Sequence, residues 1–225
     1  MSTSNQDILN NIIKNMLPKI NSEIQEAIKN NHLDPWGQIA HRVNSPGSIN
    51  LGICLARVEA SFNIINMVGL SSFHIDQLQI TAVHQGANPN ELVGTVAMTA
   101  SLTSNLSAHI GGEFQARCEF LHRSTGINGS ANVTAVKAQS TGSFTASIDG
   151  EKVCLDSIIC SPPVINYGNV NVHVGGLGVF SEFTAPLIEL NVGIFKGQVR
   201  EAISSAVSPI INQTLKTVVP QCQNV

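Results

Sequence analysis

The chain has 225 residues, which is enough for one full hydrophobic core, and β-rich chains of this length often fold as a single domain. Hydrophobic residues make up 43% of the sequence and charged residues only 12%, so uncharged polar side chains must cover much of the surface. The net charge of -3, the pI near 6.1 and the lack of any run of Lys or Arg argue against nucleic acid or an anionic membrane as the main partner.

The N-terminal segment is predicted to form an amphipathic helix over residues 5–31. Ser4 and Asp7 resemble a capping box, and an apolar residue recurs at every fourth position from Ile8. Pro18 is expected to kink this helix, and its slowly winding apolar stripe suits a helix that crosses a twisted sheet. The opposite, polar side carries Asn10, Lys14, Asn21 and Gln25. A free membrane-binding helix is the alternative, but the polar side has few basic residues.

Residues 32–48 are predicted to form a loop, because they contain Pro35, Pro46 and the single tryptophan, Trp36. From residue 49 to residue 174 the hydrophobic period is close to two, which predicts strands with one apolar and one polar face. Because no helical pattern separates these strands, they are expected to form an antiparallel meander.

Turn and glycine positions add detail to the strand region. The cleanest alternation surrounds Phe114, and Asp149-Gly150 predicts a hairpin turn. Glycines inside strands are expected to mark bulges or bends that let a sheet curl around a rod. These glycines are Gly52, Gly94, Gly111 and Gly112.

The C-terminal segment is predicted to form a second helix over residues 186–219, about 50 Å long. Up to Gly197 its apolar residues spread around most of the circumference, so this half should be buried on nearly all sides. Beyond Gly197 they narrow to one stripe, and the other side should face water. Pro209 is expected to bend the helix without ending it. The side that should face water carries Arg200, Glu201, Ser204 and Ser208.

These elements predict one α+β domain over residues 1–225. A long curled antiparallel β-sheet, residues 49–174, wraps around the long C-terminal helix, and the kinked amphipathic N-terminal helix packs beside it in a super-roll. No uncharged stretch of about 18 apolar residues is present, so no membrane span is predicted. The first residues, MSTSNQDIL, lack the pattern of a secretory leader, which predicts a cytosolic protein or numbering from near a mature terminus.

The five cysteines form no C-x-x-C pair, so neither a zinc site nor any other metal site is predicted. They allow up to two disulfides with one thiol left over, or a set of buried thiols. Cys154 and Cys160 would lie about 20 Å apart on one extended strand, so they can bond to each other only if the chain turns between them. The other three cysteines are Cys54, Cys118 and Cys222.

Catalytic signatures are missing from the sequence: it has no nucleophile elbow, zinc-protease motif, P-loop or dinucleotide fingerprint. The seven histidines are scattered, and His173 is interpreted as a solvated residue on the polar face of a strand. We therefore expect no enzymatic activity and no cofactor. Four N-x-S/T sequons occur, about as many as chance gives, so they leave N-glycosylation open. They begin at Asn105, Asn128, Asn132 and Asn212.

A concave apolar wall is the feature that a lipophilic ligand requires, and the predicted helices and strands supply candidates for it. The alternative is that the same side chains pack at ordinary interior density and leave no space. Branched aliphatic and Met side chains suit a chain-like or isoprenoid ligand better than a flat ring. The candidate ligand-binding residues are Ile12, Ile13, Met16, Ile20, Ile24, Val96, Met98, Phe114, Phe120, Phe180, Phe183, Leu187, Leu190, Ile194 and Phe195.

The order of elements, together with several short motifs, resembles the group-seven mite allergens. These belong to the superfamily of lipopolysaccharide-binding, bactericidal/permeability-increasing, PLUNC, takeout and juvenile-hormone-binding proteins (TULIP). Asp34-Pro35 and the NMVGL segment ending at Leu70 also fit the pattern. The C-terminal motifs are the GGL at Gly175–Leu177, the IF at Ile194–Phe195, the VR at Val199–Arg200 and Pro209.

The resemblance implies a secreted, non-catalytic protein that carries a lipid, fatty acid, isoprenoid or pigment in an apolar groove or tunnel between sheet and helix. It leaves a homodimer open. The chain departs from the mite proteins in its five cysteines and in its low charge. Two other functions compete with the carrier: a surface-active or structural protein at air–water or lipid interfaces, and a hydrolase whose residues meet only in the fold.

Overall fold

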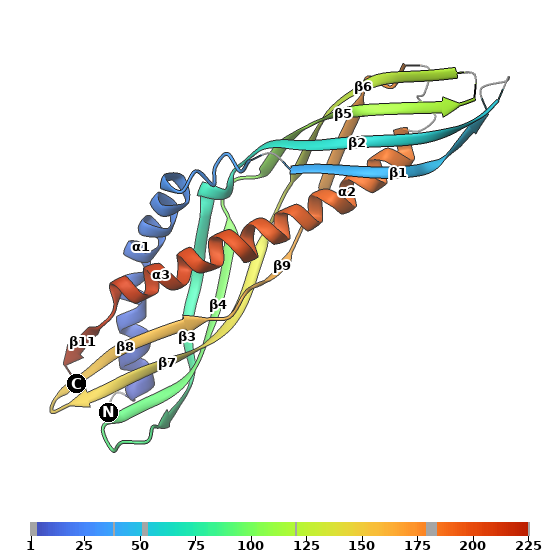
Figure 1. The fold of residues 1–225 in the computed structure, drawn as a ribbon. Helices are drawn as coiled ribbons and strands as arrows, with labels where there is room; N and C mark the ends of the chain where they lie inside the picture. Colours follow the sequence, from blue (N-terminus) through green and yellow to red (C-terminus); the bar gives the residue numbers. More distant parts are fainter. Residues whose placement is uncertain (1–3, 38, 51–53, 120, 179–183, 225) are drawn as a thin grey trace.

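The computed structural model describes residues 4–37, 39–50, 54–119, 121–178 and 184–224. The architecture is α+β, as predicted: curved antiparallel sheets follow a long C-terminal helical rod, and a second helix packs beside one end of it (Figure 1). Both ends of the chain lie at that same end of the elongated molecule (Figure 1).

The helices agree with the expected segments to within a few residues. The helix α1 runs through Pro18 without a break, and the Ser4 hydroxyl accepts the predicted capping bond from the Asp7 N–H at 3.2 Å. The C-terminal rod is one continuous element in which a π-helical segment joins two α-helices. The elements are α1 (Asn5–Asn30), α2 (Thr184–Glu201), the π segment (Ala202–Val207) and α3 (Ser208–Val218).

The strands divide into two sheets. The distal sheet, away from the chain ends, has the order β1-β2-β5-β6-β10, and the proximal sheet has the order β11-β8-β7-β4-β3, with β9 paired to β7. The strands are β1 (Ile39–Asn50), β2 (Leu55–Val68), β3 (Phe73–Gln85), β4 (Glu91–Leu102), β5 (Leu106–Cys118), β6 (Leu121–Val133), β7 (Lys137–Asp149), β8 (Lys152–Cys160), β9 (Val164–Asn166), β10 (Val170–Gly175) and β11 (Gln221–Asn224).

The predicted simple meander is wrong, because the chain passes between the sheets after each hairpin. The hairpins β3–β4 and β7–β8 lie in the proximal sheet, whereas β1–β2 and β5–β6 lie in the distal sheet. Hydrophobic period two identifies a strand but does not say which strand it pairs with. The predicted turn at Asp149-Gly150 is confirmed, with Gly150 at a φ of +60°.

The predicted loop over residues 32–48 contains most of strand β1, which is a second correction. The strand lies at the edge of the distal sheet, and its register with β2 shifts between Asn44 and Gly47, around Pro46. At such an irregularity on an edge strand, the residue does not need to donate a hydrogen bond to the neighbouring strand. A proline there is therefore compatible with a strand.

The segment before β1 is fixed by contacts that explain two of the sequence motifs. The Asp34 carboxylate accepts hydrogen bonds from the N–H groups of Gly69, at 3.1 Å, and Ser71, at 2.7 Å. Gly69 has a φ of +110°, and a Cβ there would lie 2.5 Å from the backbone oxygen of Asn105. The Asp34-Pro35 and NMVGL motifs are therefore held together by one set of contacts, which we call the joint: the Asp34 carboxylate and the backbone of Gly69 and Ser71.

Most bulges do not fall on the glycines that were expected to mark them. The register shifts instead between Ile75 and Gln77 and between Ile80 and Ala82 on β3, among other places. Gly94 allows the backbone of β3 to come close, since a Cβ at this position would lie 1.9 Å from the Ala82 carbonyl oxygen. Gly111 and Gly112 lie in an unshifted part of the β2–β5 ladder, and Gly52 lies outside the described residues.

Burial along the C-terminal rod agrees with the prediction beyond Gly197, where Val199 and Ile203 are buried and Arg200 and Glu201 are exposed, but the first half is not buried on nearly all sides. In α2, Glu189, Lys196 and Gly197 are exposed, whereas in α3 the side chains of Ile211 and Leu215 are buried. The difference arises because α3 packs against both α1 and strand β8 of the proximal sheet, whereas α2 packs along strand β10 of the distal sheet. Even Ser208, expected on the wet side, is only 7% exposed.

The π segment accommodates Pro209. A proline has no N–H and its ring would collide with the carbonyl four residues earlier, that of Ser205. Here the Ser208 N–H instead bonds to the Ile203 carbonyl five residues back, and the Ser205 hydroxyl donates to the Glu201 carbonyl. The helix therefore widens before the proline and continues, as the prediction required.

Candidate ligand-binding core and groove

The predicted ligand-binding residues separate into two groups at opposite halves of the molecule. The proximal group combines five side chains of α1 with two of β4, and the distal group combines β5 with α2. Phe120, Phe180 and Phe183 lie outside the described residues, and Leu187 and Leu190 lie in α2 with side chains outside the description. The proximal group is Ile12, Ile13, Met16, Ile20, Ile24, Val96 and Met98; the distal group is Phe114, Ile194 and Phe195.

Both groups are closely packed rather than facing open space. Exposed fractions are 8% for Met16, 4% for Ile12 and 2% for Met98, while Phe114 and Phe195 are fully buried. Ile194 is half-buried. All of them belong to or pack against one apolar core that spans both sheets and all three helices. A ligand among these residues therefore requires side chains or helices to move apart.

A surface groove of about 460 Å³ opens onto the proximal group, between α1 and the C-terminal end of the chain. Its floor is formed by Ile12, Met16 and Val218, each less than 9% exposed. Among the predicted ligand-binding residues that the structure describes, Ile12 and Met16 are the two that line this groove. Its rim is polar and rich in amides. The rim residues are Asn11, Asn15, Lys19, Gln221 and Gln223, with Cys222 beside them.

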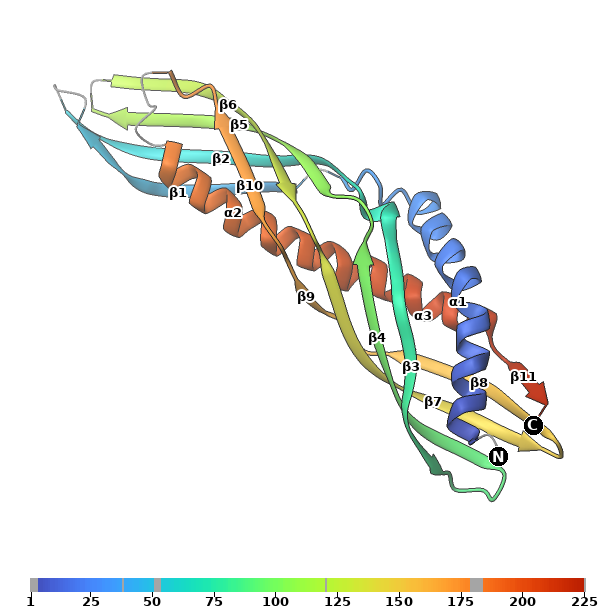
Figure 2. The same ribbon diagram turned by 180° about the vertical axis from the view of Figure 1, so that it is seen from behind.

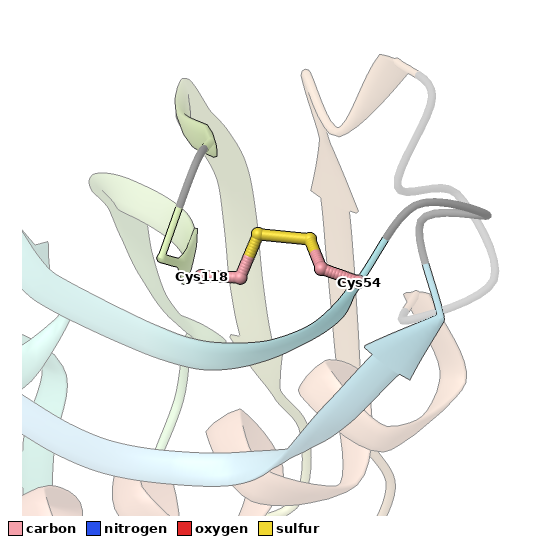
Figure 3. The surroundings of a disulfide bond; sticks show 2 residues. All are labelled: Cys54 and Cys118. Atoms are coloured by element: carbon pink, nitrogen blue, oxygen red, sulfur yellow. A yellow bond between two sulfur atoms is a disulfide. The ribbon is translucent and has the colours of Figure 1, made fainter.

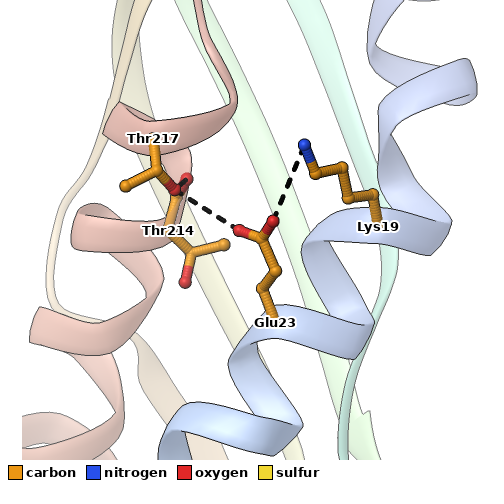
Figure 4. A network of polar contacts seen from close by, with 4 residues as sticks. All are labelled: Lys19, Glu23, Thr214 and Thr217. Carbon is orange, nitrogen blue, oxygen red and sulfur yellow. Dashed lines mark hydrogen bonds and ion pairs between the residues drawn. The ribbon is translucent and has the colours of Figure 1, made fainter.

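Two polar bridges close the ends of the groove. At one end the Thr217 hydroxyl donates to Glu23 Oε2 at 3.3 Å, across from α3 to α1, and Lys19 Nζ lies 3.7 Å from Glu23 Oε1 (Figure 4). At the other end the Asn11 amide donates to Gln223 Oε1 at 3.0 Å. Ion pairs and hydrogen bonds this exposed contribute little to stability, so the seam between α1 and α3 is weakly held from outside.

The opposite flank of α1 is held firmly on strand β3, which it follows (Figure 2). The Asn21 amide donates to the Ile75 carbonyl at 3.1 Å and accepts from the Ile75 N–H at 2.8 Å. Asn10 bonds in the same way to both backbone groups of Ile80, at 3.4 and 2.8 Å. Each amide thus takes the place of a neighbouring strand at an edge that would otherwise be unpaired.

A third asparagine repeats this arrangement on α3. The Asn212 amide donates to the Cys160 carbonyl at 2.9 Å and accepts from the Cys160 N–H at 2.9 Å, at the end of β8. We call Asn10, Asn21 and Asn212 the asparagine clamps. They fix α1 on the edge strand β3 and α3 on the end of β8, beyond the part of β8 that pairs with β11, so the uncovered seam between the helices is the weaker side.

The cysteines form two disulfides and leave one thiol, one of the arrangements allowed by the sequence. Cys54–Cys118 joins the distal ends of β2 and β5 (Figure 3), and Cys154–Cys222 ties β11 to β8 beside the groove. Cys160 is free, and burial raises the pKa of its thiol to about 11. The thiol is therefore protonated and inert near neutral pH.

Sequence reasoning missed the clamps and the groove rim. Asn10 and Asn21 were expected on the polar side of a helix. At such a position the sequence does not tell whether the amide faces water or bonds to the backbone of a strand. The rim brings together α1 and β11, which lie about 200 residues apart, and no periodicity reports such a meeting. The available signal was the surplus of Asn and Gln over charged residues on α1.

No protein-family model matches the sequence, and no curated protein matches it significantly. Within the described residues, none of the helices has the length and apolar character needed to cross a membrane.

Three solved structures that match the chain do so at low identity. Lipopolysaccharide binding protein matches at 9% identity over 97% of this chain and 39% of that chain, with a TM-score of 0.32. Takeout 1 of Epiphyas postvittana matches at 12% identity over 94% and 92%, with a TM-score of 0.39. A multidomain structure of Extended-Synaptotagmin 2 that includes its SMP domain matches at 13% identity over 96% and 38%, with a TM-score of 0.25. The chain thus spans well under half the length of the first and third of these.

Proposed function

We propose that the protein is a non-catalytic binder of a lipophilic small molecule, held between α1, α3 and the apolar face of the proximal sheet. The observation that carries this proposal is the groove whose buried floor, Ile12, Met16 and Val218, belongs to the continuous apolar core. An apolar chain that enters there removes its own surface from water, which favours binding by about 25 cal/mol per Å² before ordering costs.

Access requires the seam to open, because the core residues are closely packed. The bridges across the seam are the exposed Glu23–Thr217 and Asn11–Gln223 contacts, whereas the opposite flanks are held by the asparagine clamps. Opening at the seam therefore costs less than lifting either helix from its strand.

Family and location are part of the same proposal. The joint made by Asp34, Gly69 and Ser71 gives a structural role to motifs through which the sequence resembles the TULIP superfamily. Two disulfides favour an oxidising compartment and hence secretion. A carrier of lipids, fatty acids, isoprenoids or pigments outside the cell is consistent with both features.

The surface-active alternative needs the helices to unfold from the sheet at an interface. This would break the two hydrogen bonds of each asparagine clamp, and each such bond contributes about 0.5 to 1.5 kcal/mol relative to bonds with water. The clamps therefore favour the binder over the surfactant. A strong fall in surface tension at micromolar protein concentration, without lipid uptake, would reverse this preference.

Native mass spectrometry tests the proposal directly. Protein from its natural source, and protein refolded and incubated with a mixture of fatty acids, monoglycerides and isoprenoids, is sprayed under non-denaturing conditions. We expect an adduct of one lipid per chain in both samples. Protein that stays free of adducts in both samples, and takes up no fluorescent fatty-acid probe, would rule the binder out.

A further inference from the structure

The groove rim carries free hydrogen-bonding groups that the fold does not use. In the part of the chain that the structure describes, the amides of Asn15 and Gln221 have no hydrogen-bond partner, although both line the groove. Asn11 and Gln223, in contrast, bond to each other. Two exposed amides without a partner therefore line the same apolar groove, one from α1 and one from β11.

Charge at the rim is balanced. Lys19 is the one charged residue among the described residues that line the groove, and its ammonium group already lies 3.7 Å from the Glu23 carboxylate. A carboxylate head group would be attracted by Lys19 but repelled by Glu23. An ammonium head group would be attracted by Glu23 but repelled by Lys19. A neutral head meets no such opposition.

We propose that the groove binds the head of a neutral, hydroxylated, single-chain amphiphile, such as a monoglyceride. Asn15 and Gln221 each offer both a donor and an acceptor, which matches hydroxyl and ester groups, since these also donate or accept. The chain runs over the floor of Ile12, Met16 and Val218 and enters the seam between α1 and α3. This inference rests on the proposed function and specifies its ligand class and orientation.

Calorimetric titration with three probes of equal chain length tests the proposal: monomyristoylglycerol, myristic acid and myristylamine. We expect the wild-type protein to bind the monoglyceride about tenfold more tightly than either charged probe. Asn15→Ala and Gln221→Ala should each weaken monoglyceride binding by about three- to tenfold, as expected for one lost hydrogen bond, and leave myristic acid binding unchanged.

Matched controls separate the head site from general effects. Asn30→Ala on α1 and Gln139→Ala on β7 remove exposed amides away from the groove and should bind all three probes like the wild type. Circular dichroism and thermal melts confirm the fold of each variant, since neither Asn15 nor Gln221 uses its side chain within the described structure.

Each outcome separates the two proposals. If the charged probes bind as tightly as the monoglyceride, or if the two rim variants bind like the controls, the head-group assignment fails while the lipid-binding function stands. If no probe binds to the wild-type protein, both proposals fail.

Discussion

At the scale of single residues, three asparagines attach the helices to the strands of the proximal sheet. Asn10, Asn21 and Asn212 each use both ends of the amide on one strand residue, as a neighbouring strand would. Asn21 is only 5% exposed. If its amide were removed, water could not easily reach the backbone groups of Ile75 to replace the lost hydrogen bonds. The short, two-ended amide is what lets a helix seal the edge of a sheet.

Replacing Asn21 by Ala should destabilise the protein by about 2 to 3 kcal/mol, because the N–H and carbonyl of Ile75 then lose their partner while they stay buried. Urea unfolding monitored by circular dichroism measures this change. The control Asn30→Ala, at an exposed position of the same helix, should alter stability by less than about 0.5 kcal/mol. A loss for Asn21→Ala as small as that of the control would show that the clamp is not needed.

Cys160 predicts a pH dependence. Burial raises the pKa of its thiol from 9.0 to about 11, so the folded protein keeps the proton that the unfolded chain releases. The resulting stability is present in full below pH 9 and is lost as the pH rises from about 9 to about 11, by at most about 2 to 3 kcal/mol.

Unfolding free energies of the wild type and Cys160→Ala across this pH range isolate the effect, since other groups titrate equally in both proteins. The wild type should lose stability more steeply than the variant. Parallel curves, or rapid alkylation of Cys160 by iodoacetamide in the folded protein at pH 8, would contradict the protonated, buried thiol.

At the scale of elements, the sequence located the helices and most strands but not their surroundings. The helix α1 and the rod from Thr184 to Val218 follow from periodicity and capping, because those patterns are local. Strand β1 escaped prediction because Pro46 sits at a bulge on an edge, where the usual rule against proline does not apply. The exposure of one side of α2 and the burial of Ser208 in α3 depend on where the sheets and α1 lie, which is a property of the whole fold.

At the scale of elements, we predict that the attachment of strand β11 depends on its disulfide. It is short, and Cys154–Cys222 ties it to β8. We expect the double variant Cys154→Ala/Cys222→Ala to release β11, so that amide hydrogens of Gln223 and Asn224 exchange at least about tenfold faster and the groove loses one wall. The matched variant Cys54→Ala/Cys118→Ala, at the far end of the molecule, should leave β11 unchanged. Equal exchange in β11 of both variants would mean that backbone pairing alone holds the strand.

At the scale of the whole molecule, one apolar core runs through both halves, but the halves differ in how they are closed. The distal sheet is covered by α2, and the proximal sheet is sealed by two clamped helices with a seam between them. The sequence predicted the rod and the curled sheet. It did not predict that the candidate residues would form two packed groups, because that depends on which strands cross between sheets.

Photocrosslinking locates the ligand and thereby tests the binder most directly. A fatty acid with a diazirine in its chain is equilibrated with the protein, irradiated, and the labelled peptides are identified by mass spectrometry. We expect labels on the face of α1 that carries Ile12 and Met16 and on α3 near Val218, with competition by unlabelled lipid. Labels confined to the outer faces of the sheets, or labelling that excess lipid does not reduce, would contradict binding at the seam.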